Sequence, residues 1–160
     1  MRVSCTLRLA TASDIPVLVS HRRRMFEDMD ALKGVTRDRA GFDAMDAAYV
    51  VILCYEIPVG STRVWVLEDA GQIVASGALK FTDWLPRPDG QRRGLVYVHS
   101  VYTAPEYRRQ GLARRILQAM IAYCRENDWL RISLHASDMG RGLYEELGFK
   151  PTNELRLVLE

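Results

Sequence analysis

Residues 101–113 carry the most specific pattern in this chain. They read Val101-Tyr102-Thr103-Ala104-Pro105-Glu106-Tyr107-Arg108-Arg109-Gln110-Gly111-Leu112-Ala113. The apolar pattern of residues 94–103 predicts a strand, and Pro105 ends it. Beyond the run, apolar residues recur every three or four positions, which predicts an amphipathic helix over residues 111–127. The run therefore joins the end of a strand to the start of a helix.

A helix that begins near Gly111 offers free amide groups to a ligand. About four N–H groups at a helix start have no partner within the helix, and together they carry about half a positive charge. Gly111 lets a phosphate approach the backbone, and Arg108, Arg109 and Arg114 can add forked hydrogen bonds. The sequence contains neither a P-loop nor a GxGxxG pattern. We therefore predict a phosphate cradle here, with a plain turn glycine as the alternative.

The flanking segments predict a mixed α/β fold. Strands are expected at residues 6–9, 64–67, 73–81 and 130–134, and a last strand at Leu155, Leu157 and Leu159. Helices are expected after Thr11 or Ser13, within residues 38–55, and over residues 140–147. Residues 94–135 then form a strand–helix–strand crossover with parallel strands, and the flanking hairpins extend the sheet antiparallel. We expect one domain over residues 1–160, with helices on both faces of the sheet.

Two segments resemble motifs of the GCN5-related N-acetyltransferases. The acetyl-CoA motif of that family, Arg/Gln-x-x-Gly-x-Gly/Ala, is met at Arg108, Gly111 and Ala113. Residues 143–149 are similar to a later motif of the family, at the expected distance. The resemblance implies a fold in which the fourth and fifth strands are parallel and splay apart. It also implies that the pantetheine of acetyl-CoA runs between these two strands.

The resemblance further implies roles for single residues. Tyr144 matches a tyrosine that faces the sulfur, and we expect it to act as the general acid. Asp138 takes the place of an asparagine that touches the cofactor, although Asp138 can instead cap the helix that follows. The remaining residues expected to bind the cofactor, through backbone or side chain, are Val101, Thr103, Arg108, Arg109, Gln110, Gly111, Ala113 and Arg114.

The base that removes the proton of the acceptor is left open by the sequence. His99 shares one face of its strand with Tyr97, and the ordinary pKa of histidine suits the task. No acidic residue lies between Leu95 and Thr103. The alternatives to His99 are a chain of water molecules or the neutral fraction of the amine. His21 is expected either to line the acceptor cleft or to pack at the surface or in the core.

The acceptor site is expected between the two N-terminal helices and the loop at residues 82–93. Trp84 can cover a substrate there. The acidic residues Glu27, Asp28 and Asp30 can attract a cationic amine or simply form a charged helix face. The expected reaction is transfer of an acetyl group from acetyl-CoA to a primary amine of a small molecule, an amino acid derivative or a peptide. A non-catalytic acyl-CoA-binding module is the alternative.

Composition disfavours several other classes of function. The formal charge of +2 signals no general affinity for nucleic acid, and the arginine clusters at residues 22–24, 92–93 and 114–115 lie on separate elements. The three cysteines show no CxxC spacing, and no two histidines have the spacing of metal ligands. The longest apolar run, residues 47–55, is far shorter than the roughly 20 residues of a membrane span. We expect a cytoplasmic protein without a metal; the resemblance adds a possible homodimer.

Overall fold

A five-stranded sheet forms the centre of the computed structural model, which describes residues 4–88 and 94–159. Its strands, in the order β1-β2-β3-β4-β5, are Thr6–Leu9, Thr62–Asp69, Gln72–Thr82, Leu95–Thr103 and Ile132–Ser133. The first four strands pair antiparallel with their sequence neighbours, whereas β5 lies parallel to β4. The mixed, mostly antiparallel sheet predicted from the sequence is therefore confirmed.

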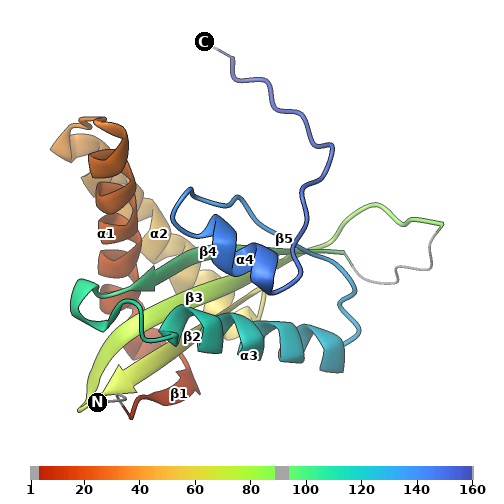
Figure 1. The fold of residues 1–160 in the computed structure, drawn as a ribbon, viewed down its shortest axis with the longest axis horizontal. Helices are drawn as coiled ribbons and strands as arrows, with labels where there is room; N and C mark the ends of the chain where they lie inside the picture. The colour runs from red at the N-terminus through yellow and green to blue at the C-terminus, as the bar shows by residue number, and fades with distance from the viewer. Residues whose placement is uncertain (1–3, 89–93, 160) are drawn as a thin grey trace.

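Helices cover both faces of this sheet (Figure 1). The long helices are α1 (Ile15–Lys33), α2 (Arg39–Val59) and α3 (Leu112–Glu126). One buried cluster, which includes Leu79, Ile116 and Leu117, lies between the sheet and α3. A second cluster, which includes Leu18, Leu53 and Val66, lies between the sheet and the pair α1 and α2. Strands β2 and β3 contribute to both clusters, and this explains why their buried stretches are continuous apolar runs.

Short elements connect the long ones and mark where predicted boundaries shift. The 3-10 helix η1 (Ala12–Asp14) precedes α1 and carries a capping box at Thr11, while η2 (Pro105–Tyr107) follows β4. Helix α2 continues through Pro58 and ends at Gly60, which has a φ of 75°. Helix α4 (Arg141–Glu146) lies before Gly148, whose φ of 96° suits the predicted left-handed helix end.

The last strand predicted from the sequence is wrong. Residues 149–159 have no helix or strand, and they leave the body of the molecule as an extended segment (Figure 1). Leu155 is 96% exposed and Leu157 is 83% exposed. An alternating pattern forms a strand only where a neighbouring strand offers free backbone groups, and β5 is only two residues long. Within residues 4–88 and 94–159, no helix has both the length and the hydropathy to cross a membrane.

Candidate functional site

The parallel strands β4 and β5 separate after a short contact. They pair only at Val96 with Ile132 and at Tyr97 with Ser133. Strand β5 then ends, whereas β4 continues to Thr103. In the described part of the chain, residues 98–103 thus have a strand partner on the β3 side alone. This divergence confirms the predicted splayed pair and leaves an open edge on β4.

A cavity of about 1200 Å³ lies along this open edge. Its walls come from α1, from residues 97–103 of β4, from the loop and helix start at residues 107–114, from residues 135–146, and from Arg156. Of the two N-terminal helices expected to shape it, only α1 contributes lining residues. Residues 82–88 do not line it, and Trp84 is 63% exposed. Residues 89–93, the rest of the expected acceptor loop, lie outside the described residues.

The start of α3 presents free amides to the cavity. Gly111 has a φ of 79°, and a Cβ atom at this position would meet nothing within 4 Å. In the described structure, the amides of residues 111–114 donate no hydrogen bond, and the first to do so is that of Arg115, to Gly111 O at 3.1 Å. Unpaired amides at the positive end of a 15-residue helix form an anion site. Because no side chain blocks them, the geometry agrees with the predicted cradle.

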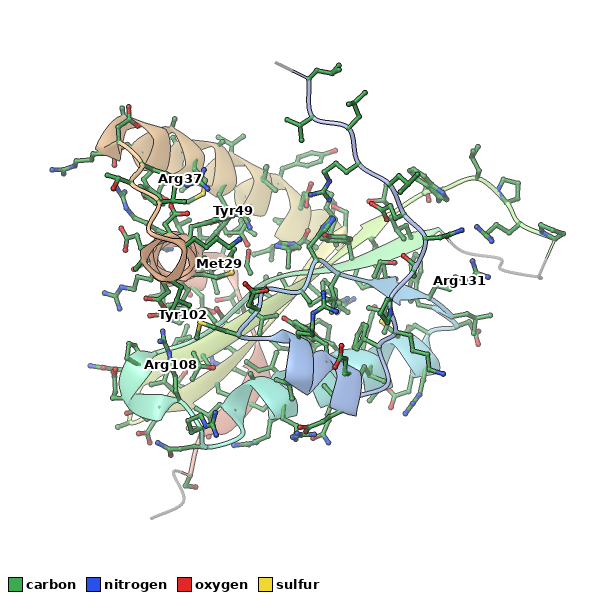
Figure 2. The ribbon with its side chains drawn as sticks, turned by 45° about the horizontal axis from the view of Figure 1, so that its top comes forward. Met29, Arg37, Tyr49, Tyr102, Arg108 and Arg131 are labelled. Carbon is green, nitrogen blue, oxygen red and sulfur yellow. The ribbon has the colours of Figure 1, made fainter. Side chains whose placement is uncertain are left out.

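Some side chains of the same loop form hydrogen bonds or ion pairs within the protein, and others do not. Arg108 donates from Nε to Thr103 O at 3.0 Å and from Nη2 to Asp28 Oδ2 at 2.5 Å, and its guanidinium lies over Tyr102 (Figure 2). Arg108 therefore ties the loop to α1 and β4. Arg114 pairs with Glu146, and Gln110 donates to Glu106 O at 3.2 Å. Arg109, which is exposed, forms no ion pair with a described carboxylate.

Thr103 adds an unsatisfied polar group to the cavity wall. Its Oγ1 atom is buried and has no hydrogen-bond partner among the described residues. Both Thr103 and Val101 line the cavity on the open edge of β4. A buried hydroxyl without a partner costs roughly 1–3 kcal/mol.

A bulge in β4 turns the side chains of His99 and Ser100 toward the helices α1 and α2. Ser76 pairs with Tyr102 and Ala78 pairs with His99, so Gly77 faces both Ser100 and Val101. Ser100 has a φ of 53°, which is uncommon for a residue other than glycine. The extra residue of a bulge has no ladder partner of its own. The bulge thus interrupts the regular pairing of β3 with β4 at Ser100 and Val101, which line the cavity.

His99 lies at this bulge and is neutral at physiological pH. Burial, followed by the positive charges of Arg22 and Lys80, lowers the pKa of His99 to about 4. Its Nδ1 atom lies 3.0 Å from Ser100 Oγ, and the residue lines the cavity. A neutral imidazole can accept a proton. With this pKa, however, it has little power to deprotonate an ammonium ion near pKa 10.

Helix α4 places Tyr144 in the cavity wall that residues 135–146 form. The ring of Tyr144 packs at 5.8 Å from that of Phe149 and against the core under α3. Burial raises the pKa of Tyr144, so its hydroxyl stays protonated at neutral pH. That hydroxyl has no hydrogen-bond partner among the described residues, although the residue lines the cavity. Tyr144 therefore packs against the core with its ring and keeps a hydroxyl that is free to donate a proton.

Asp138 does not cap α4, so this alternative is wrong. The oxygen Oγ of Ser137 accepts a hydrogen bond from Gly140 N at 3.2 Å, and its backbone oxygen accepts one from Arg141 N at 3.0 Å. Ser137 and Met139 line the cavity, whereas Asp138 is exposed and does not. Serine and aspartate are equally good caps, so the sequence pattern could not choose between neighbours. Contact of Asp138 with the cofactor stays a prediction.

Two histidines outside β4 take different places. His21 is buried: its Nδ1 lies 2.8 Å from Ser76 Oγ, and its ring centroid is 4.8 Å from that of Tyr102. The expectation that His21 packs in the core is thus confirmed. Burial and the charge of Arg24 lower its pKa to about 4. His135 is exposed at the cavity rim, with its ring centroid 5.5 Å from that of Tyr97.

The acidic residues of α1 are all paired, and sequence reasoning missed one of its arginines. Asp28 binds Arg108, Asp30 binds Arg37, and Glu27 binds Arg23, which favours the helix-face interpretation for these acids. Arg22 instead lines the cavity and donates from Nη1 to Ser100 Oγ at 2.8 Å. Its only signal in the sequence was the arginine run at 22–24, which does not say which arginine faces the sheet.

The arginine clusters that suggested RNA binding do not form one surface in the described structure. Arg22 points into the cavity, and Arg23 pairs with Asp43 and Asp46. Arg114 is bound to Glu146 on the far side of the sheet from Arg23. The pair at residues 92–93 lies outside the described residues. These contacts leave the RNA interpretation without support.

Comparison with known proteins identifies a family whose sequence model matches this chain. A family model described as an acetyltransferase (GNAT) domain matches residues 60–151. A GCN5-related N-acetyltransferase from Ralstonia eutropha has a TM-score of 0.86 and 25% identity, with 98% of this chain and 99% of that chain covered. A protein from Clostridium acetobutylicum, described as a predicted acetyltransferase with acetyl-CoA, has a TM-score of 0.86 and 26% identity, covering 97% and 96%.

More distant structures share the fold alone. Glucosamine-6-phosphate N-acetyltransferase from Arabidopsis thaliana has a TM-score of 0.64 and 16% identity, covering 98% of each chain. No protein of curated function matches the chain. The family model nevertheless spans more than half of the sequence, including both motifs and the splayed strands. On this basis the chain belongs to the GNAT family of acetyltransferases.

Proposed function

We propose that the chain transfers the acetyl group of acetyl-CoA to a primary amine in a ternary complex. One observation carries this proposal: the gap between β4 and β5 opens onto the free amides at the start of α3, within the cavity that also contains Tyr144. Acetyl-CoA supplies the activated acetyl group. The presence of acetyl-CoA in the similar Clostridium acetobutylicum protein supports this choice of donor.

The residues of the cavity fit the two ends of this donor. We expect the amides of residues 111–114 and the exposed Arg109 to bind the diphosphate, because they are the unpaired donors of the 108–113 loop. The open edge of β4 at Val101 and Thr103 suits the pantetheine, whose amides can pair with backbone as a strand does. Arg108 is expected to act by holding the loop in place.

A backbone amide of β4, Tyr144 and His99 would then stabilise the developing charge and transfer protons. We expect a backbone amide at the bulge of β4 to donate to the carbonyl oxygen as negative charge develops there. As the C–N bond forms and the C–S bond breaks, Tyr144 gives its proton to the sulfur. The amine loses one proton, and the products are an N-acetylated amine and a free thiol. Tyr144 recovers its proton from solvent.

The low pKa of His99 bears on the protonation state in which the amine enters the site. An imidazole of pKa about 4 does not deprotonate an alkylammonium ion to a useful extent. We therefore propose that the amine enters from its neutral fraction. His99 then accepts the proton that becomes acidic once the nitrogen bonds to carbon. This combines two of the alternatives for the base that the sequence left open.

Thiol release from acetyl-CoA, measured across a panel of primary amines, amino acid derivatives and peptides, tests the proposal. A melting-temperature shift with acetyl-CoA is measured in parallel, because a ligand of the folded state raises it. Turnover with any amine supports the enzyme. A clear melting-temperature shift without turnover of any amine supports the non-catalytic acyl-CoA-binding module. The absence of both the shift and turnover contradicts the enzyme and the binding module alike. Light scattering on the same sample tests the predicted homodimer.

A further inference from the structure

Arg22 is a charged group of the cavity that the proposed function leaves unexplained. It lies on α1, and its guanidinium carbon is 5.1 Å from the ring centroid of Phe26 and 4.9 Å from that of Tyr49. Its Nη1 donates to Ser100 Oγ, a neutral acceptor. No described aspartate or glutamate lies within ion-pair distance of it. A guanidinium has five N–H donors, and this one uses a single hydrogen bond.

Three other arginines of the cavity and of α1 are neutralised by carboxylates, whereas Lys33, Arg109 and Arg156 line the cavity without an ion pair to a described carboxylate. Arg108 is paired with Asp28, Arg114 with Glu146, and Arg23 with Asp43 and Asp46. Six Arg or Lys side chains line the cavity against two carboxylates, and both of those carboxylates are already used in these pairs. The cavity therefore carries excess positive charge. A half-buried cation without a partner favours an anion in the ligand.

The position of Arg22 separates it from the diphosphate end of the site. Arg22 binds Ser100, at the bulge in the middle of β4, whereas the 108–113 loop begins after β4 has ended. Ser100 also lies 3.0 Å from His99, the residue expected to accept the amine proton. Cation–π contacts with these two aromatic rings hold the guanidinium in place. An anion on Arg22 would thus lie near the acceptor nitrogen and away from the loop at the start of α3.

We infer that the acceptor is an amine that also carries an anionic group, a carboxylate or a phosphate, which Arg22 binds. This inference rests on the proposed function. It excludes polyamines and lysine-rich peptides as preferred acceptors, because a second positive charge in this part of the cavity would face Arg22 without a carboxylate to offset it. The acceptor nitrogen remains neutral in the attack, so its neighbouring anion supplies the charge complementarity.

Three acceptors of equal chain length separate the possibilities: an alkylamine, an ω-amino acid and an aminoalkyl phosphate. Their amines have similar pKa values, so their neutral fractions match at a given pH. We expect kcat/KM for at least one anionic acceptor to exceed that of the alkylamine by about tenfold or more, as for a hydrogen bond to a charged group. The better of the two anions identifies the group that Arg22 binds.

Arg22→Gln tests the residue itself. Glutamine keeps a donor for Ser100 but removes the charge, so we expect the preference for the anionic acceptor to disappear. Arg23→Gln, one position along the same helix, is the matched control, because its charge is bound to Asp43 and Asp46. Both variants should keep the melting shift with acetyl-CoA. A short carboxylate without an amine should also inhibit the wild-type protein in competition with the acceptor, and the matched alcohol should not.

The outcomes distinguish the inference from the proposed function. If no acceptor releases thiol, both fall together. If the alkylamine reacts as well as its anionic partners, and the carboxylate does not inhibit, the inference is overturned while the acetyltransferase stands. If the anionic preference survives Arg22→Gln, Arg22 is not the anion site. A preference that Arg22→Gln abolishes and Arg23→Gln retains supports the inference.

Discussion

Gly111 permits a sharp test of the diphosphate cradle through a pair of substitutions of equal size. Gly111→Asn and Gly111→Asp place side chains of the same shape in front of the free amides of α3. Both residues tolerate the left-handed backbone better than other non-glycine residues do, and a Cβ at this position meets nothing within 4 Å. We therefore expect both variants to fold. Only the aspartate adds a negative charge where the diphosphate is expected.

The size of the effect follows from Coulomb's law. Two unit charges about 6 Å apart at an effective dielectric constant of about 20 repel each other by about 3 kcal/mol. Gly111 is exposed, so salt and solvent reduce this repulsion. A remaining difference of about 1.4 kcal/mol corresponds to a tenfold loss of affinity. We expect Gly111→Asp to bind CoA at least about tenfold more weakly than Gly111→Asn.

Isothermal titration with CoA at low and high salt measures this difference. The gap between the two variants should narrow as salt rises, because screening weakens repulsion between exposed charges. Melting curves without ligand serve as the folding control and should agree for the two variants. Equal affinity of Gly111→Asp and Gly111→Asn at low salt would show that no phosphate binds at the start of α3. The proposed place of the donor would then be refuted.

Three further predictions concern the proposed catalytic groups and the buried histidines. Tyr144→Phe should lower kcat about a hundredfold, as for loss of a general acid, and keep the melting shift with acetyl-CoA; unchanged kcat removes Tyr144 from the chemistry. The pH profile of kcat/KM should rise toward the pKa of the amine without a bend near pH 6.5, because the pKa of His99 is about 4; a bend that disappears in His99→Asn contradicts this. The contribution of His21 and His99 to the free energy of unfolding should level off above about pH 7.5 and fall toward pH 4 by up to about 2.7 kcal/mol per pH unit, because the unfolded chain protonates two histidines whose folded pKa values are lowered. Urea unfolding at pH 7 and pH 5 measures this fall, the exposed His135→Gln is the control, and equal stability at both pH values counts against the burial of His21 and His99.

Elements with a strong local pattern were predictable. The apolar stripe of α3, the strand β4 before it and the glycine between them are encoded by neighbours in the sequence, so the helix start and its free amides could be located in advance. The order of strands and helices, and with it the mixed sheet, follows from the same periodicities. The family resemblance added the splayed strands, which periodicity does not encode.

Features that depend on distant partners were not predictable. Residues 155–159 alternate as a strand does, yet they find no neighbouring strand. Asp138 was a candidate cap of α4, but the oxygen that accepts the amide of Gly140 belongs to Ser137. The unpaired Arg22 emerged only when α1 packed across β4 and the bulge turned Ser100 toward it.

Local chemistry in the chain was thus enough to specify the helices, most strands and the start of α3 with its free amides, because these depend on residues a few positions apart. Packing between remote segments set the length of β5, the course of the C-terminal residues, the lowered pKa of His99 and the free charge of Arg22. Burial and charge pairing are properties of the space around a side chain. They exist only once α1, the sheet and α4 have come together.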